Sequence, residues 1–267
     1  MIDRNIFDLT GRTAIVTGGG GILGRHFCEG LAAFGANVVV VDVVKEAAET
    51  VANALPGKKL ALAVDITDEQ QVEKLVADVR KQYGRIDILH NNAATKPKDL
   101  ARFFDPVENF DMQVWRDIMQ VNLDGMFTVA RHVGGFMAQT GKGSIIQTAS
   151  IYGVVAPDQR IYEGSEYLGH CINTPAVYSA SKAGVIGLTK YLCSYWAEKG
   201  VRVNTLTPGG VESGQNDVFK RNYSARIPMG RMAQAPEMVG ALVFLASDAS
   251  SYITGQNIIV DGGLTAW

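Results

Sequence analysis

The stretch YSASK, residues 178–182, places a tyrosine and a lysine four positions apart in a helix-like segment. At this spacing the two side chains share one face of a helix. A cation held beside a phenol favours the phenolate, so such a tyrosine can exchange protons nearer neutral pH. An ordinary amphipathic helix can carry the same pair by coincidence. Tyr178 and Lys182 alone therefore do not establish an active site.

A glycine-rich segment near the start of the chain has the setting of a dinucleotide-binding loop. TGGGGILG (residues 17–24) follows a β-rich run and precedes a helix-like run of small residues. Glycines there let the backbone turn sharply and approach a pyrophosphate, whose charge meets helix N-terminal N–H groups. Asp42 ends the next apolar run, 24 residues after Gly18. A carboxylate at that point accepts hydrogen bonds from a ribose and repels a 2′-phosphate, so the pattern predicts NAD rather than NADP, with Arg25 as the one nearby cation.

The elements that must position these residues form an alternating series. Short apolar runs alternate with periodic helical segments, which predicts a parallel sheet covered on both faces. We expect one α/β domain over residues 1–267, a Rossmann-like doubly wound parallel sheet, because no linker or repeat divides the chain. Besides the first two strands, strands are expected at 60–64, 86–90, 144–148, 202–206 and 257–260, and helices at 69–83, 112–139, 176–199 and 236–247.

Composition excludes several classes of function. The net charge of −2 over 267 residues gives no general attraction to nucleic acid or to an anionic membrane. No uninterrupted apolar run approaches the roughly 20 residues of a membrane span, and the first residues carry charges where a signal peptide needs apolar ones. Cys28, Cys171 and Cys193 lack the spacing of metal ligands. We expect a soluble cytoplasmic protein with no metal.

Seven motifs in order make the chain resemble the short-chain dehydrogenase/reductase family. TGGGGILG is similar to the family's TGxxxGxG loop, and NNAA (residues 91–94) to its NNAG. Asn122 in QVNLDG, Ser150 in TASIYG and the YSASK pentapeptide match its catalytic positions. PGGVES (residues 208–213) is similar to its PGxxxT, with Ser213 in place of threonine, and DGG (residues 261–263) matches its C-terminal signature.

The resemblance implies a catalytic set of four residues. Tyr178 would act as the general acid/base on the substrate oxygen, and Ser150 would hydrogen-bond the same oxygen. Lys182 would hold the nicotinamide ribose and lower the pKa of Tyr178. Asn122 would complete a proton relay to Lys182 through water.

The resemblance also implies the cofactor contacts. Asp65 and Ile66 would flank the adenine, residues 92–94 would line the ribose, and residues 208–211 would hold the nicotinamide. Ile22 stands where the family usually has glycine, and Ala94 replaces the glycine of NNAG. The full expected set is Gly18, Gly21, Ile22, Leu23, Gly24, Asp42, Asp65, Ile66, Asn92, Ala93, Ala94, Tyr178, Lys182, Pro208, Gly209, Val211 and Ser213.

The chain between Ser150 and Tyr178 departs furthest from the family. It is 27 residues long, more than the family typically leaves there, which indicates an insertion at about 156–175. A second insertion is expected at 95–110. With the segment 212–228, both should open at the carboxyl edge of the sheet, where doubly wound proteins bind ligands. The candidates to face the substrate are Tyr152, Arg160, Tyr162, Glu163 and Arg221.

The function expected from these features is NAD-dependent interconversion of a secondary alcohol and a ketone. Polar side chains in the three segments, with Lys220, Arg221 and Arg226 in the third, suggest a hydroxylated and anionic substrate such as a sugar acid, with a sugar or a polyol in the same class. Two alternatives stay open, a biosynthetic carbonyl reductase of the 3-ketoacyl reductase type and a non-catalytic dinucleotide-binding regulator. The insertion could also pack on a neighbouring subunit. Small residues along the YSASK helix resemble the family's subunit interface, so a homotetramer is expected, with a dimer as the second possibility.

Overall fold

A computed structural model describes residues 5–97, 99–167 and 169–267 of the chain. Seven strands pair in parallel in the order β3-β2-β1-β4-β5-β8-β9. The predicted doubly wound α/β sheet is confirmed. The strands are β1 (Thr13–Thr17), β2 (Asn37–Asp42), β3 (Lys59–Ala63), β4 (Ile88–Asn91), β5 (Gly143–Thr148), β8 (Val201–Pro208) and β9 (Asn257–Val260).

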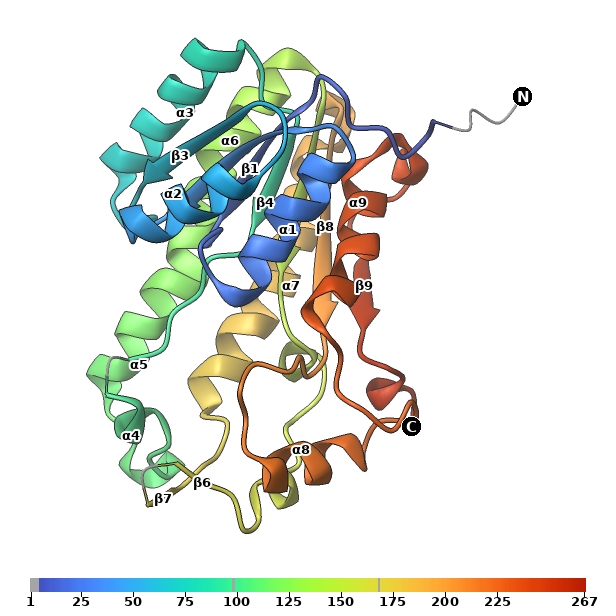
Figure 1. Cartoon of the computed structure of the whole chain (residues 1–267). Helices are drawn as coiled ribbons and strands as arrows, with labels where there is room; N and C mark the ends of the chain where they lie inside the picture. Colours follow the sequence, from blue (N-terminus) through green and yellow to red (C-terminus); the bar gives the residue numbers. More distant parts are fainter. Residues whose placement is uncertain (1–4, 98, 168) are drawn as a thin grey trace.

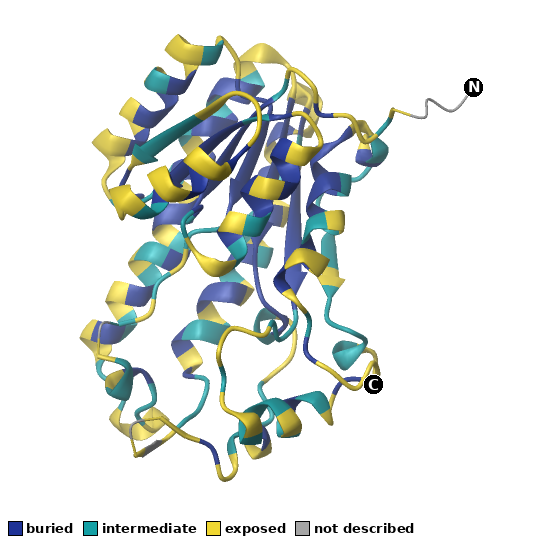
Figure 2. Ribbon diagram, viewed as in Figure 1, coloured by how far each residue is buried: buried dark blue, intermediate teal, exposed yellow. Residues whose placement is uncertain are grey.

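Helices cover both faces of this sheet, and each face has its own apolar core (Figures 1 and 2). On one face α1 (Ile22–Ala33), α2 (Lys45–Ala54) and α9 (Val239–Ala246) pack around side chains such as Phe27 and Leu242. On the other face lie α3 (Glu69–Tyr83), α6 (Met126–Thr140) and α7 (Ala176–Trp196). Because both faces are buried, the central strands are continuous apolar runs, as in the VVVV of β2.

The expected helices are present, and two of them depart locally from a regular α-helix. The helix at 69–83 is confirmed. It begins after Asp68, which accepts hydrogen bonds from Gln70 N and Gln71 N, and it ends at Gly84 in the left-handed conformation. The helix expected at 112–139 is interrupted. It consists of α5 (Met112–Met119), a π-helical turn at Gln120–Gly125 that contains Asn122, and α6. The last expected helix begins with a 3₁₀ turn at Ala235–Met238.

Three segments leave the carboxyl ends of the strands and gather below the sheet in Figure 1. The segment after β4 contains α4 (Leu100–Phe103) and a 3₁₀ turn at Val107–Asn109. The segment after β5 contains 3₁₀ turns at Ile151–Gly153 and Gln159–Tyr162 and a hairpin of β6 (Glu166–Tyr167) and β7 (His170–Cys171). The third contains α8 (Asp217–Ser224). Lys98 and Leu168, one in each expected insertion, lie outside the described residues.

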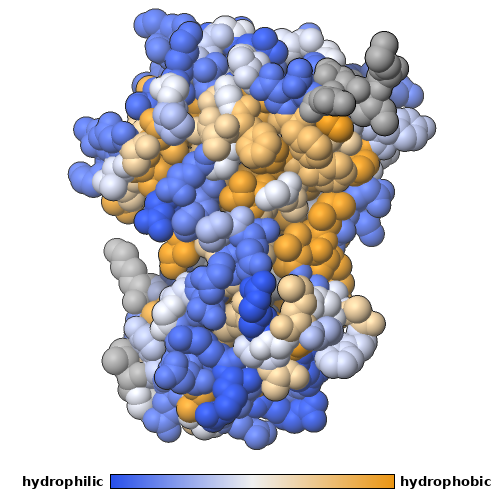
Figure 3. All heavy atoms as spheres, turned by 45° about the vertical axis from the view of Figure 1, so that its right-hand side comes forward, coloured by the Kyte–Doolittle hydropathy of each residue, from blue (hydrophilic) through white to orange (hydrophobic). Residues whose placement is uncertain are grey.

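This lower part differs from the sheet in burial. In Figure 2 the strands are largely buried, whereas α8 and the hairpin are mostly intermediate or exposed. Figure 3 shows the surface narrowing between the upper body and the lower part, with apolar residues gathered along the middle of that face. Among the described residues, no helix is long and apolar enough to cross a membrane.

Candidate active site

The hydroxyls of Ser150 and Tyr178 meet at the carboxyl end of β5. Ser150 follows that strand and begins the 3₁₀ turn Ile151–Gly153, where its Oγ accepts a hydrogen bond from Tyr152 N at 3.3 Å. Tyr178 lies in the first turn of α7. The Ser150 hydroxyl lies close enough to the Tyr178 phenol to lower the pKa of that phenol. Both line the same cavity, so the structure brings together the two side chains expected to hold a substrate oxygen.

Lys182 lies one turn further along α7 and is buried. Its Nζ donates a hydrogen bond to the Thr148 carbonyl at 3.0 Å and lies 5.9 Å from the centre of the Tyr178 ring. Burial lowers the pKa of Lys182 to about 8, because the ammonium is poorly solvated there. Thr148, which the motifs do not mark as functional, therefore fixes the lysine.

The pKa of Tyr178 moves in the direction opposite to the one expected. Burial of the phenol raises its pKa, and the Ser150 hydrogen bond offsets only part of that effect. The Lys182 ammonium donates its hydrogen bond to the Thr148 carbonyl. The cost of desolvating the Tyr178 phenolate therefore determines the direction of the pKa shift. Tyr178 is consequently a protonated acid at neutral pH.

Asn122 lies in the π-helical turn between α5 and α6 and is fully buried. Its Oδ1 accepts a hydrogen bond from Thr95 N at 2.8 Å, which ties this turn to the segment after β4. Its Nδ2 has no partner among the described residues. Buried amide donors rarely lack a partner, so this atom fits a role in binding a water or a ligand. The proton relay itself stays a prediction.

The glycine loop between β1 and α1 fits a dinucleotide because side chains are excluded from its backbone. Gly18 has φ +63°, and a Cβ there would lie 2.9 Å from Ala93 Cα. A Cβ on Gly24 would lie 2.0 Å from the Gly18 carbonyl oxygen. Gly21 precedes α1 and leaves its first N–H groups open to an anion. Ile22 is 58% exposed, so the isoleucine in place of glycine does not fill the loop.

Asp42 is held at the end of β2 beside this loop. Its Oδ2 accepts a hydrogen bond from Gly20 N at 3.0 Å, and its Oδ1 accepts one from Val44 N at 3.1 Å. Val43 and Val44 are exposed at the positions that follow. Arg25, the nearby cation, lies with its Nε 3.9 Å from a carboxylate oxygen of Glu29 on its own helix. The local chemistry suits a ribose diol better than a phosphate.

Thr17, a residue that the predictions did not mark, joins the glycine loop to NNAA. Its Oγ1 accepts hydrogen bonds from Asn92 N at 2.9 Å and Ala93 N at 3.1 Å. Asn92 Nδ2 donates to the Thr17 carbonyl at 3.2 Å. Ala94 follows and lines the cavity. In the sequence, the position of Thr17 directly before the glycines is the feature from which this role could be inferred.

The remaining cofactor candidates lie along the same edge of the sheet. Asp65 Oδ1 accepts hydrogen bonds from Thr67 N and Oγ1 at 2.9 and 2.7 Å, and Ile66 is buried. Past β8, Gly209 N donates to Val260 O at 2.8 Å and Ser213 N donates to Gln215 Oε1 at 2.7 Å. Val211 forms an isolated bridge with Ala233, Pro208 ends β8, and Leu23 packs against the core. Their contacts with a cofactor stay predictions.

These features fit a nicotinamide dinucleotide, NAD or NADP. Residues 18–24 would hold its pyrophosphate, Asp42 would lie at its adenosine ribose, and Tyr178 with Lys182 would lie at the nicotinamide end. When bound, this cofactor supplies the acceptor or donor of a hydride.

A cavity of about 460 Å³ adjoins the Ser150 and Tyr178 hydroxyls. Of the five substrate candidates, Tyr152 and Tyr162 line it. Aromatic side chains that were not predicted line it too, and of these Phe219 and Tyr223 occur four positions apart on one face of α8, a spacing visible in the sequence. The lining residues are Ala94, Thr95, Lys96, Phe103, Ser150, Ile151, Tyr152, Tyr162, Thr174, Tyr178, Gly209, Gly210, Gln215, Phe219, Tyr223 and Met232.

Arg160, Glu163 and Arg221 do not line this cavity, and their contact with a substrate stays a prediction. Arg160 Nη2 pairs with Asp158 Oδ2 at 2.7 Å, and this carboxylate holds the guanidinium at the surface. Glu163 is exposed just after the 3₁₀ turn. Arg221 is two positions from both Phe219 and Tyr223, which places it on the opposite side of α8.

Comparison with known proteins shows that the chain belongs to the short-chain dehydrogenase/reductase family. A family model described as enoyl-(acyl carrier protein) reductase matches residues 20–265. An NAD-dependent glycerol dehydrogenase of Listeria innocua is 32% identical over 97% of this chain and 96% of its own. A 2,5-dichloro-2,5-cyclohexadiene-1,4-diol dehydrogenase of Sphingobium indicum is 37% identical over 97% and 99%. The structure of a gluconate 5-dehydrogenase from Burkholderia cenocepacia, in complex with NADP and tartrate, has a TM-score of 0.84 and 34% identity, covering 98% of each chain.

Proposed function

We propose that this protein is an NAD-dependent oxidoreductase that interconverts a secondary alcohol and a ketone on a small hydroxylated substrate of the sugar, sugar acid or polyol class. The observation that carries the proposal is the placement of Ser150 and Tyr178 together on the wall of a cavity beside a glycine cradle. Relatives named as glycerol and gluconate dehydrogenases support the substrate class.

The protein's own groups divide the proton chemistry. In ketone reduction, Tyr178 donates its phenol proton to the substrate oxygen, and its raised pKa keeps that proton available at neutral pH. In alcohol oxidation, Tyr178 must first be deprotonated to accept the alcohol proton. Ser150 holds the same oxygen through its hydroxyl. We therefore expect oxidation to accelerate as the pH rises above neutral and reduction to slow.

The choice of NAD over NADP rests on Asp42. Its two carboxylate oxygens are fixed by Gly20 N and Val44 N, so the negative charge cannot swing away from a 2′-phosphate. Replacing Asp42 with Ser should lower the ratio of kcat/KM for NAD to that for NADP at least tenfold. Glu49→Gln, which changes a carboxylate further along α2, is the matched control. A wild-type protein that prefers NADP would overturn this part of the proposal.

A biosynthetic carbonyl reductase of the 3-ketoacyl reductase type is the second candidate function, since relatives named 3-oxoacyl-[acyl-carrier-protein] reductase are 34% and 32% identical to this chain. Against it, the 156–175 segment is fastened to α8 next to the cavity: Asn216 Nδ2 donates to Ser165 Oγ at 2.8 Å, and Asn222 Nδ2 donates to Glu163 O at 3.1 Å. These bonds close the cavity on the side of α8 and leave less room for a long acyl chain. Initial rates of NAD-linked oxidation over polyols, sugar acids and 3-hydroxyacyl thioesters separate the two. Turnover of thioesters alone would favour the reductase.

A non-catalytic regulator is excluded by the same screen once a Tyr178-dependent turnover is measured.

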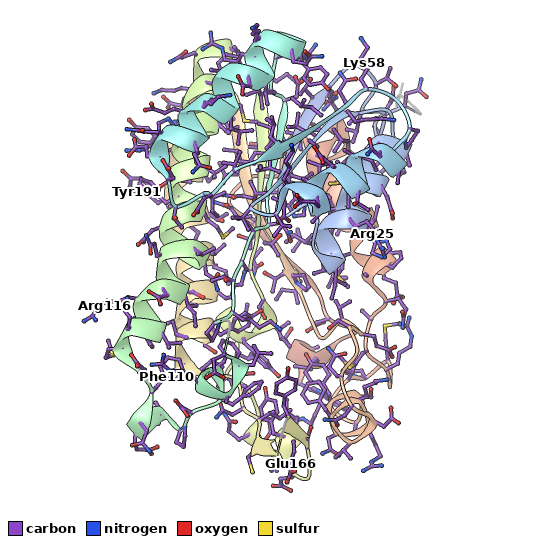
Figure 4. The ribbon with its side chains drawn as sticks, turned by 60° about the vertical axis from the view of Figure 1, so that its left-hand side comes forward. Arg25, Lys58, Phe110, Arg116, Glu166 and Tyr191 are labelled. Carbon is purple, nitrogen blue, oxygen red and sulfur yellow. The ribbon has the colours of Figure 1, made fainter. Side chains whose placement is uncertain are left out.

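The homotetramer stays a proposal, which exposed aromatic side chains on α7 support. Along α7, Tyr191 and Tyr195 stack with ring centres 6.1 Å apart although both are more than half exposed. Figure 4 shows Tyr191 at the outer edge of the molecule, and Tyr191 does not line the cavity. Sedimentation of the wild type and of Tyr191→Ala measures whether this face is an interface.

A further inference from the structure

The walls of the cavity separate hydroxyl groups from aromatic rings. Ser150, Tyr178 and Tyr152 lie next to one another on the side formed by the end of β5 and the start of α7. The other side consists of a ladder of rings. Tyr162 and Phe219 stack with centres 5.7 Å apart at 26°, and Phe219 and Tyr223 follow at 5.4 Å and 33°. All of these residues line the cavity.

Three tyrosine hydroxyls meet where the two sides join. The phenols of Tyr152, Tyr162 and Tyr223 lie near one another on the cavity wall, and the Tyr162 hydroxyl forms a hydrogen bond with Thr174 Oγ1. We call this group, Tyr152, Tyr162 and Tyr223, the tyrosine cluster. Each hydroxyl can rotate to donate or to accept a hydrogen bond. The cluster is therefore suited to a neutral oxygen at a fixed distance from the Ser150–Tyr178 pair.

Charge on the cavity wall is sparse. Among the described lining residues, Lys96 carries the only charge at neutral pH, and no carboxylate lines the cavity. Three cations of the neighbouring segments are paired with carboxylates outside the wall, Arg160 and Arg226 with Asp158 and Lys220 with Asp217, and Arg221 does not line the cavity. A substrate recognised through several ionic groups does not match this wall.

We propose that the site takes a ring-shaped substrate, a cyclic diol or polyol, whose C–H face lies against Phe219 and Tyr162 while a second ring oxygen binds at the tyrosine cluster. The proposal rests on the alcohol–ketone function proposed above and narrows its substrate class. It makes the 156–175 segment a specificity element, because that segment supplies Tyr162.

A six-membered ring matches the cavity because it has an apolar face and a polar rim, as the cavity has an aromatic side and a hydroxyl side. Its C–H groups form a broad apolar face, which aromatic side chains cover well, and its hydroxyls lie around the rim. An open-chain polyol carries hydroxyls along its whole length, and those pressed against rings would lose their hydrogen bonds to water without replacement. An open chain must also immobilise several torsions on binding, a cost that a ring has already met.

The test compares two substrates of equal carbon number and equal vicinal hydroxyls, cyclohexane-1,2-diol and hexane-3,4-diol. We expect kcat/KM for the ring to exceed that for the open chain at least tenfold. Phe219→Leu, which keeps an apolar side chain but removes the ring, should bring this ratio close to one. Tyr252→Leu is the control, because Tyr252 is fully exposed and outside the cavity, and its ratio should match the wild type.

The second oxygen has its own readout. In Tyr152→Phe the ratio of kcat/KM for cyclohexane-1,2-diol to that for cyclohexanol should fall roughly tenfold, since one hydrogen bond to the second oxygen is lost. A merely structural role would lower both rates equally. Preference for the open chain, or a ring preference untouched by Phe219→Leu, would overturn the proposal while the alcohol dehydrogenase function stands. No oxidation of any alcohol with NAD or NADP would remove both.

Discussion

The two halves of this site are built in different ways. On the cofactor side, buried strands lead into a backbone cradle in which Gly18 and Gly24 leave no room for a side chain. On the substrate side, short turns, a two-residue hairpin and α8 surround a small apolar cluster around Ile151, Ile161 and Tyr223. In Figure 4, Glu166 marks the lower tip of this second region and points away from the molecule.

The difference shows where each kind of information lies in the chain. A cradle that excludes Cβ atoms admits one residue type at each position, so it leaves a motif. A cavity wall made of rings and hydroxyls admits many combinations, and these leave no motif. The substrate side should therefore be the easier one to change without loss of the fold.

Tyr178→Phe should give the largest effect, because it removes the acid/base group and keeps the ring. We expect turnover to fall about a thousandfold or more, within the usual range for general acid–base catalysis. Binding of NAD should change little, since the loop and Asp42 are untouched. Steady-state rates and NAD titration by fluorescence measure the two quantities. A variant that keeps a tenth of the activity would show that another group moves the proton.

Gly24→Ala tests the cofactor side alone. The added Cβ would lie 2.0 Å from the Gly18 carbonyl oxygen, a contact that only a backbone shift of the loop relieves. We expect NAD affinity to fall about a hundredfold and thermal stability to drop by several degrees. Gly135→Ala in α6 is the matched control, because a Cβ there meets nothing within 4 Å and alanine is the better helix residue. Equal behaviour of the two variants would contradict the cradle.

How much the sequence could predict follows the same division. Several features are local sequence patterns: the alternation of apolar and helical runs, the glycine loop, Asp42, and the order of Ser150, Tyr178 and Lys182. The structure places the glycine loop and these residues along one edge of the sheet. The side chains of Arg160, Glu163 and Arg221 could not be placed, because their direction depends on Asp158 and on the orientation of α8. The direction of the Tyr178 pKa was missed because burial is a property of the packed molecule.

His90 is a buried side chain of the sheet that should make the stability of the fold depend on pH. It is fully buried on β4, with Nε2 2.8 Å from Thr148 Oγ1 and its ring 4.3 Å from that of Phe27. Burial lowers the pKa of His90 from 6.5 to about 3. Between these values the unfolded chain binds the extra proton and the folded chain does not, so stability falls as the pH drops below 6.5.

At pH 5 this loss should reach about 2 kcal/mol, the value of one and a half pKa units. His90→Gln should be less stable at pH 7 but should lose less stability between pH 7 and pH 5 than the wild type. Urea unfolding at both pH values measures the free energy of unfolding. His26→Gln, at the surface of α1, is the control. An unchanged acid-side loss in His90→Gln would assign the effect to other groups.

Asn222→Ala should give the smallest effect and tests the fastening of the substrate side. The amide donates to the carbonyls of Ile161 and Glu163 at 3.3 and 3.1 Å, and it joins α8 to the segment that carries Tyr162. Removing it should cost about 1 kcal/mol locally, with little change in the global melting temperature, because this region packs on a small cluster. Hydrogen exchange should therefore accelerate over residues 156–167 and in α8 and stay unchanged in β1 and β4. Asn53→Ala on α2 should leave exchange in both regions as in the wild type. Acceleration in the sheet strands as well would mean that the two halves unfold as one unit.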